Sequence, residues 1–257
     1  MKTELKIVNF FGKLIQLKPR KSKNLSRIQG LKKVRYESYI TLFRYLILQI
    51  LMEKEKEIKY IYVDVETEGL KAKVLLQIAA ITKEGEVFSE YIKPSHDIPL
   101  SCTRITGLYN KNKELFKNGN KLDAKPIRIV LRQFFEWISQ FEGDIHFVCY
   151  NGFTFDVKVL LTHCQRQNLK FPENVTFVHD PLPTFRKFMK TEQIKDFKLT
   201  TLAEHFKIPF LNAHDALSDC ECLKQLCENY AEENKIEFAN FLDAYKKPIG
   251  YFIAKIK

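Results

Sequence analysis

Several features that define large protein classes are missing from this chain of 257 residues. It has no Gly-x-x-x-x-Gly-Lys-Ser/Thr loop, which excludes a P-loop nucleoside triphosphatase. It has no Gly-x-Ser-x-Gly turn, so we do not interpret Ser218 and His214 as parts of a nucleophile triad. The most apolar run, residues 45–52, is far shorter than the roughly 20 residues that span a bilayer, and the N-terminus lacks the apolar core of a signal peptide. We therefore expect no membrane association and an intracellular protein of the nucleus or cytoplasm.

Cysteine pairs with the spacing of a zinc or redox motif are also missing. The six cysteines include no Cys-x-x-Cys pair, and their distribution is typical of reduced, buried thiols in an intracellular protein. A zinc site of His214 with Cys220, Cys222 and Cys227 stays an alternative. The spacing of these four residues does not favour it, because it matches no familiar zinc pattern.

Positive charge is distributed unevenly along the chain. Residues 1–57 contain 14 lysines and arginines against 5 acidic residues, whereas the remaining 200 residues contain 28 basic and 26 acidic residues. The net charge of +11 therefore lies mainly in a basic N-terminal arm. Such an arm suits binding to a polyanion such as nucleic acid, and a solvated lysine-rich leader is the alternative interpretation.

The body that follows the arm predicts an α/β domain. Three consecutive strand patterns predict an antiparallel meander, and the later alternation of strands and helices predicts that the sheet becomes parallel in its second half. We expect a mixed five-stranded sheet flanked by helices, preceded by an amphipathic helix at 37–56 and followed by a partly helical tail at 233–257. The predicted strands span 59–65, 74–82, 86–92, 145–150 and 175–179, and the predicted helices span 126–141, 156–168, 181–190, 199–206 and 215–230.

Acidic residues interrupt the apolar pattern of this body at three places. Asp64 and Glu66 lie two residues apart at the end of the first predicted strand, so their side chains share one face of it. Asp156 follows the fourth predicted strand. Asp219 lies in the last predicted helix, five residues after His214. Carboxylates gathered at one point repel each other unless a cation balances their charge.

The chemistry of these residues favours hard divalent cations. Carboxylates without thiolates or several imidazoles prefer Mg²⁺ or Mn²⁺. Two such ions about 4 Å apart form the arrangement that catalyses in-line displacement at phosphorus. A histidine with a pKa near neutrality, such as His214, can take the proton of the attacking water. The pattern therefore predicts a phosphorus-directed reaction with two Mg²⁺ ions, which Mn²⁺ can replace.

The three acidic segments resemble the sequence blocks of a known enzyme family. Residues 64–70 (DVETEGL), 151–156 (NGFTFD) and 214–219 (HDALSD) resemble the blocks of the DEDDh 3′-to-5′ exonucleases, above all those of the three-prime repair exonuclease group. The segment RITGL at 104–108 is similar to a further segment of that family. The resemblance implies a ribonuclease H-like domain over residues 58–232, with the arm and the tail outside it.

The resemblance also implies roles for individual residues. His214 matches the general base, and Thr67 matches part of the backbone cradle near the 3′ hydroxyl. Leu70 matches the apolar residue that packs against the terminal base, and Ile105 matches a residue that lines the terminal-nucleotide pocket. Asn151 matches the asparagine of the second block, for which the alternative role is to hold its loop by hydrogen bonds. The implied metal ligands, which are also catalytic, are Asp64, Glu66, Asp156 and Asp219.

Two positions depart from the family's pattern without removing a catalytic group. Glu68 stands where a threonine is usual, so that it either weakens phosphate binding or faces solvent, and Tyr150 stands where many members have histidine. The resemblance implies a metal-dependent 3′-to-5′ exonuclease that hydrolyses single-stranded DNA or RNA from the 3′ end to nucleoside 5′-monophosphates, and it is compatible with a homodimer. The alternative is a non-catalytic module of the same fold that binds nucleic acid or protein.

Overall fold

A computed structural model describes residues 57–69, 74–189 and 194–256 of the chain. These residues belong to the structural unit Lys56–Lys257. The helix predicted at 37–56 and the predicted substrate residue Leu70 lie outside the described residues.

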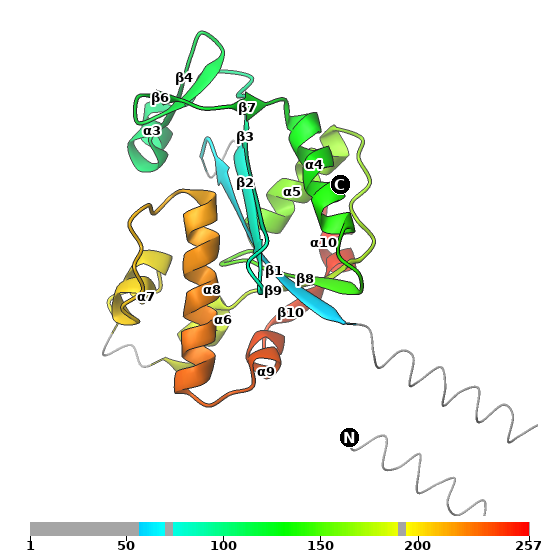
Figure 1. Cartoon of the computed structure of the whole chain (residues 1–257), viewed down its shortest axis with the longest axis vertical. Helices are drawn as coiled ribbons and strands as arrows, with labels where there is room; N and C mark the ends of the chain where they lie inside the picture. The colour runs from blue at the N-terminus through cyan, green and yellow to red at the C-terminus, as the bar shows by residue number, and fades with distance from the viewer. Residues whose placement is uncertain (1–56, 70–73, 190–193, 257) are drawn as a thin grey trace, which may run out of the picture. The chain divides into compact units, whose positions relative to one another are not determined.

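The described residues form a mixed sheet, whose strands are, in order across the sheet, β10 (Lys246–Pro248), β9 (Val175–His179), β8 (Asp144–Val148), β1 (Ile58–Thr67), β2 (Leu75–Thr82), β3 (Val87–Ile92) and β7 (Ala124–Lys125). The central strand β1 is antiparallel to β2 and parallel to β8, and β2 is antiparallel to β3 (Figure 1). The predicted change from an antiparallel meander to a parallel half, and with it the mixed α/β fold class, is confirmed.

Among the described residues this sheet has seven strands instead of the five predicted. The predicted strands correspond to β1, β2, β3, β8 and β9. The additional strands, β7 and β10, are two and three residues long and pair at the two edges of the sheet. Strands this short show no alternation of apolar and polar residues, so the sequence pattern does not reveal them.

Helices cover both faces of the sheet (Figure 1). On one face, α8 (Ala216–Glu233) packs against β1 and β2. The other face is covered by α4 (Ile127–Ser139), α5 (Asp156–Arg166) and α10 (Ile249–Ile253). Three shorter helices lie on the side of α8, namely α6 (Leu182–Phe188), α7 (Leu199–His205) and α9 (Phe238–Asp243).

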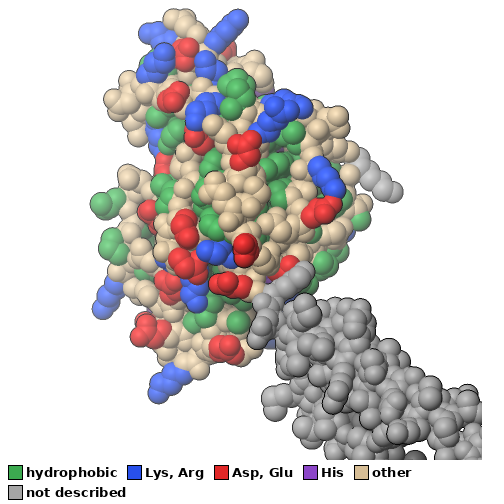
Figure 2. All heavy atoms as spheres, turned by 45° about the vertical axis from the view of Figure 1, so that its right-hand side comes forward, with side chains coloured by type: hydrophobic (Ala, Val, Ile, Leu, Met, Phe, Trp, Pro, Cys, Tyr) green, Lys and Arg blue, Asp and Glu red, His purple; other side chains and the backbone are tan. Residues whose placement is uncertain are grey.

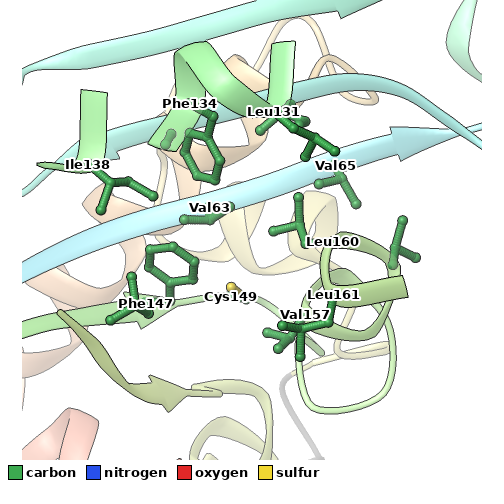
Figure 3. Close-up of a cluster of buried hydrophobic side chains, with 14 of the residues drawn as sticks. Val63, Val65, Leu131, Phe134, Ile138, Phe147, Cys149, Val157, Leu160 and Leu161 are labelled. Atoms are coloured by element: carbon green, nitrogen blue, oxygen red, sulfur yellow. The ribbon is translucent and has the colours of Figure 1, made fainter. Parts of the chain in front are cut away.

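Strand β1 contributes to two separate hydrophobic cores because its side chains alternate between the faces of the sheet. Val63 and Val65 point into the core formed with α4 and α5, where they lie near Phe134 and Leu160 (Figure 3). Tyr62 belongs to the other core, which is formed with α8. The next two residues on the face of Tyr62 are the two acids of the first block.

A smaller sheet occupies a segment in which we predicted no regular element. The segment begins with α3 (Leu100–Thr106), and the described strands that follow are β4 (Leu108–Lys111), β5 (Glu114–Lys117) and β6 (Asn120–Lys121). This hairpin sheet and α3 lie together at one end of the domain, next to β3 and β7 (Figure 1). Asn118 in its second turn has a φ of 50°, a left-handed conformation that asparagine tolerates.

The C-terminal tail contributes to the same domain. Strand β10 pairs with β9, and Phe252 of α10 is fully buried in the core with α4 and α5. None of the helices in the described part of the chain is long and apolar enough to cross a membrane. Figure 2 shows acidic and basic side chains interspersed over one face of the domain, as its nearly balanced charge leads us to expect.

Candidate active site

Asp64 and Glu66 continue the face of β1 that packs against α8. The residue before them on this face, Tyr62, is fully buried in the core with α8. Glu66 is also buried, and it lies opposite Gln77 of the neighbouring strand β2. The alternation of side chains therefore places both carboxyl groups on one face, as the sequence predicts.

Asp156 is the first residue of α5, and a backbone contact brings it beside β1. The N–H of Val65 donates a hydrogen bond of 3.3 Å to Oδ1 of Asp156, across 91 residues of sequence. The loop before Asp156 is held by the buried carboxylate of Asp180, which accepts hydrogen bonds from the N–H groups of Asn151 (3.0 Å) and Phe153 (3.3 Å). Asp180 lies directly after β9, where no motif marks it, so the sequence analysis missed it.

The third acidic segment is the turn that leads into α8. Oδ1 of Asp219, in the first turn of this helix, accepts a hydrogen bond of 3.3 Å from the backbone N–H of His214. The exposed residue His214 has a φ of 65°, which is uncommon for a residue other than glycine. One potential ligand atom from each of Glu66, His214 and Asp219 lies within 4.8 Å of the other two. The three segments thus meet at one place.

The carboxyl groups of this cluster destabilise one another's charged forms. Burial, together with the charges of Asp156, Asp219 and Glu66, raises the pKa of Asp64 well above its ordinary value. Burial and neighbouring carboxylates raise the pKa of Glu66 to about 8. The pKa values of Asp156 and Asp219 are each raised to about 7, again mainly by burial. The charge of Lys117 lowers the pKa values of Glu66 and Asp219 but does not offset the effect of their burial. The hard oxygen donors of the cluster therefore fit a divalent cation.

The residues predicted to contact substrate differ in their surroundings. The hydroxyl of buried Thr67 donates a hydrogen bond of 3.3 Å to the carbonyl of Gly69 and shapes the turn after β1. Ile105 of α3 is 60% exposed and lines a cleft of about 520 Å³. The side-chain oxygen of Asn151 accepts a hydrogen bond of 2.8 Å from the hydroxyl of Thr154, which matches the alternative role of holding its loop.

A comparison with protein families identifies the domain that carries this site. The family model RNase_T, described as an exonuclease, matches residues 61–227. The chain belongs to this exonuclease family. The matched segment runs from β1 to α8 and includes all four predicted acids and His214.

Curated relatives of this exonuclease domain are much longer than the chain. The DNA polymerase III PolC-type of Streptococcus pyogenes serotype M2 (strain MGAS10270) is 30% identical over 208 residues, which cover 74% of this chain and 13% of the relative. The PolC-type polymerase of Streptococcus mutans serotype c (strain ATCC 700610 / UA159) is 30% identical over 212 residues, which cover 78% of this chain and 13% of the relative. The chain thus spans about an eighth of the length of these relatives.

Solved structures share the fold of the exonuclease domain. The zinc-bound form of an E. coli ExoI–ssDNA complex matches with a TM-score of 0.57 at 18% identity, covering 73% of this chain and 42% of the other. An Exonuclease I from Methylocaldum szegediense matches with a TM-score of 0.56 at 19% identity, covering 73% and 43%. At these identities the likeness shows a common fold, and the ribonuclease H-like prediction is confirmed.

The two departures from the family's pattern are both accommodated inside the exonuclease domain. Glu68 is buried, and its carboxylate pairs with the imidazole of His96 in the loop after β3. The alternative in which Glu68 faces solvent is therefore wrong, because a partner distant in sequence covers it. The hydroxyl of Tyr150 donates a hydrogen bond of 2.6 Å to the carbonyl of Phe197, so this side chain ties its loop to the segment before α7.

The cysteines of the exonuclease domain are free and buried, as predicted. Burial raises the pKa of Cys220, and its thiol donates a hydrogen bond of 3.5 Å to the carbonyl of Ala79. Among the described residues, the group that could hold a metal joins His214 to two carboxylates and contains no cysteine. The geometry therefore does not support the zinc alternative.

Asp215, which follows the candidate base His214 in the exonuclease domain, was not predicted as a site residue. Its Oδ1 accepts a hydrogen bond of 3.4 Å from the N–H of Ser218 and caps α8. Its Oδ2 accepts hydrogen bonds from Nζ of Lys117 (2.7 Å) and from the hydroxyl of Tyr91 (2.8 Å). No local pattern could have shown this contact, because Lys117 comes from the hairpin sheet and Tyr91 from β3.

Proposed function

We propose that this exonuclease domain removes nucleotides from the 3′ end of single-stranded DNA and releases nucleoside 5′-monophosphates. The observation that carries the proposal is the meeting of four carboxyl groups and one histidine from three separate segments at one end of β1. Burying several carboxylates together is unfavourable without a compensating cation. Such a cluster is suited to a metal-dependent reaction at phosphorus.

The residues that would hold the metal are the four acids. Carboxylate oxygens suit Mg²⁺, and Mn²⁺ accepts the same donors, so we propose two Mg²⁺ ions that Mn²⁺ can replace. When bound, the ions supply the positive charge that activates the attacking water and stabilises the leaving oxygen. The proposed ligands are Asp64, Glu66, Asp156 and Asp219.

His214 is the proposed general base. Partial desolvation of the ring and the charge of Lys117 lower the pKa of His214, so the imidazole is neutral near pH 7. A ring nitrogen can then take a proton from the attacking water. In-line attack on the terminal phosphodiester forms a bond from the water oxygen to phosphorus and breaks the bond to the 3′ oxygen of the penultimate nucleotide. That oxygen then takes a proton from solvent.

The comparisons support DNA as the substrate. The curated relatives are DNA polymerases, and E. coli Exonuclease I was crystallised in complex with dT13 and dA16 oligonucleotides. One observation favours a second candidate, a non-catalytic module that binds nucleic acid or protein. Outside the arm, the chain has only a small excess of basic over acidic residues and so offers little attraction to a phosphate backbone. The complete set of acids and the histidine favours hydrolysis.

The test follows a 5′-labelled single-stranded DNA oligonucleotide that is incubated with the full chain and Mg²⁺ or Mn²⁺. We expect a ladder of products shortened from the 3′ end, and no products in EDTA. Phosphorothioate linkages at the 3′ end should slow the reaction, whereas the same linkages at the 5′ end should not. An RNA oligonucleotide of the same sequence should be cut more slowly. An intact oligonucleotide with either metal would overturn the proposal and support the non-catalytic module.

A further inference from the structure

The side chains around Asp215 connect three strands to the turn that carries His214. Besides Lys117 and Tyr91, Gln77 of β2 reaches Oδ2 of Asp215 with its side-chain nitrogen, at 3.5 Å. We propose that the Asp215 clamp, defined as Asp215 with Lys117, Tyr91 and Gln77, positions His214 for proton transfer. This inference rests on the proposed function and adds positioning residues to it.

The clamp continues a row of side chains that starts at the acid cluster, which consists of Asp64, Glu66, Asp156 and Asp219. In the register of the sheet, Glu66 of β1 lies opposite Gln77 of β2, and Gln77 lies opposite Tyr91 of β3. Directly opposed residues point to the same face of a sheet, so the three side chains line one face. Lys117 approaches from the hairpin sheet and completes the set of donors to Asp215. The clamp therefore lies on the same face of the sheet as Asp64 and Glu66, on the strands that follow β1 across the sheet.

The clamp fixes the backbone on the C-terminal side of His214. The side-chain oxygen of buried Gln77 accepts a hydrogen bond of 3.2 Å from the N–H of Ala216, so both residues after His214 are held. On its other side, the N–H of His214 is held by Asp219. The turn before it is open, since the side chain of Leu211 is 95% exposed. A residue with positive φ between an open turn and a helix depends on such contacts to keep one orientation.

The two oxygens of Asp215 separate this role from helix capping. Oδ1 caps α8 through Ser218, whereas Oδ2 receives the three donors of the clamp. Asparagine caps helices about as well as aspartate but carries no charge to hold a lysine. The substitution Asp215→Asn therefore weakens the clamp while keeping the cap, and Tyr91→Phe removes one donor while keeping the ring.

The first experiment measures kcat and KM for a single-stranded DNA oligonucleotide with Lys117→Met, Tyr91→Phe and Asp215→Asn. We expect Lys117→Met and Asp215→Asn to lower kcat about tenfold or more, but by no more than the 10²–10⁴ that a general base contributes, and Tyr91→Phe to lower it less. KM should change less than about twofold, and Lys117→Arg should restore part of the loss because it restores a charged donor. The matched control is Lys121→Met on the same hairpin sheet, whose exposed ammonium lies 3.6 Å from Glu114 and which should leave kcat unchanged.

The second experiment repeats the substitutions in a His214→Ala background. If the clamp acts through His214, Lys117→Met and Tyr91→Phe should lower the residual kcat less than about twofold there. Equal losses in both backgrounds would overturn the inference. A raised KM with unchanged kcat would also overturn it, because Lys117 lines the same cleft as Arg104 and would then act as a substrate contact. If a Lys117 variant fails to fold, Tyr91→Phe still tests the inference, because this substitution keeps the packing of the ring.

The third experiment is independent of catalysis. Nuclear magnetic resonance of histidine-labelled, metal-free protein should show the ring signals of His214, assigned with His214→Ala, shift in Tyr91→Phe and Lys117→Met but not in Lys121→Met. Unshifted signals would overturn the positioning role. If the wild-type protein cuts no oligonucleotide but these signals shift, the proposed function fails while the clamp's effect on His214 stands.

Discussion

The acid cluster at the end of β1 is buried or half-buried and the histidine pair on β8 and β9 is buried, but their hydrogen-bonding and charge requirements are met differently. In the pair, the side chains of His146 and His179 join through Nδ1 of His146 and Nε2 of His179 at 2.9 Å. Nδ1 of His179 lies 2.9 Å from the carbonyl oxygen of Leu242. A chain in which His146 donates to His179 and His179 donates to Leu242 satisfies these groups with both rings neutral.

The acid cluster has no such internal balance. Its carboxyl groups raise one another's pKa values, and Lys117, whose charge lowers the pKa of Glu66, is already paired with Asp215. Burial instead lowers the pKa of His146, to about 4, and the pair stays neutral. The histidine pair is therefore balanced within the fold, whereas the acid cluster leaves negative charge that the proposed divalent ions would balance.

The largest expected effect comes from removing one charge of the acid cluster. Asp64→Asn keeps the shape of the side chain but removes a ligand charge, so we expect hydrolysis of the oligonucleotide to fall to the level of wild-type protein in EDTA. The same variant should unfold at a higher temperature than wild type without metal, because burial and the neighbouring carboxylates disfavour the charged form of Asp64, and asparagine carries no charge. The substitution Asp123→Asn at an exposed position is the matched control for both measurements. Wild-type activity in Asp64→Asn would contradict the assignment.

Removing the proposed base should have the next largest effect. His214→Ala should lower kcat by about 10²–10⁴, the usual contribution of general base catalysis. Binding of the oligonucleotide, measured by fluorescence anisotropy in Ca²⁺, should stay within about twofold because the acids remain. His205→Ala, at an exposed position of α7, is the control and should retain wild-type kcat. A loss of binding as large as the loss of kcat would show that His214 binds substrate and does not act as the general base.

Metal binding should stabilise the domain in a pH-dependent way. The raised pKa values mean that Glu66, Asp156 and Asp219 hold protons more tightly in the folded chain, so without metal their stabilising contribution is lost as the pH rises through about 7 to 8. Metal at 100 times its Kd adds about 2.7 kcal/mol to the free energy of unfolding. Thermal unfolding with Mn²⁺ and with EDTA should therefore differ by more at pH 8.5 than at pH 6, where protons compete with the metal. A difference that does not grow with pH would contradict this account.

The parts of the site that could be predicted are those set by local patterns. Period-two alternation places Asp64 and Glu66 on one face, and the helix predicted at 215–230 matches α8, which carries Asp219. The long strands of the sheet were predicted for the same reason, because each has enough residues to show a pattern.

The parts that could not be predicted depend on contacts between residues distant in sequence. Lys117 reaches Asp215 across 98 residues, and nothing near either residue marks the other as its partner. The burial of Glu68 likewise depends on His96 in another loop. The edge strands β7 and β10 form because β3 and β9 offer unpaired backbone groups, not because their own two or three residues favour strands.

The smallest effect is expected for the histidine pair, whose hydrogen bonds are satisfied within the fold. The pKa of His146 falls from about 6.5 in the unfolded chain to about 4 in the folded one, so the unfolded chain binds the extra proton first as the pH falls. The free energy of unfolding, measured with urea, should therefore drop by about 2 kcal/mol from this group between pH 7 and pH 5. In His146→Phe the drop should be smaller by that amount, whatever the variant's stability at pH 7. Without metal, the acid cluster contributes more to stability as the pH falls over the same range, opposite to the histidine pair. If the free energy of unfolding of His146→Phe fell with pH as steeply as that of wild type, the pair would not be held neutral. The contrast between the two clusters would then not hold.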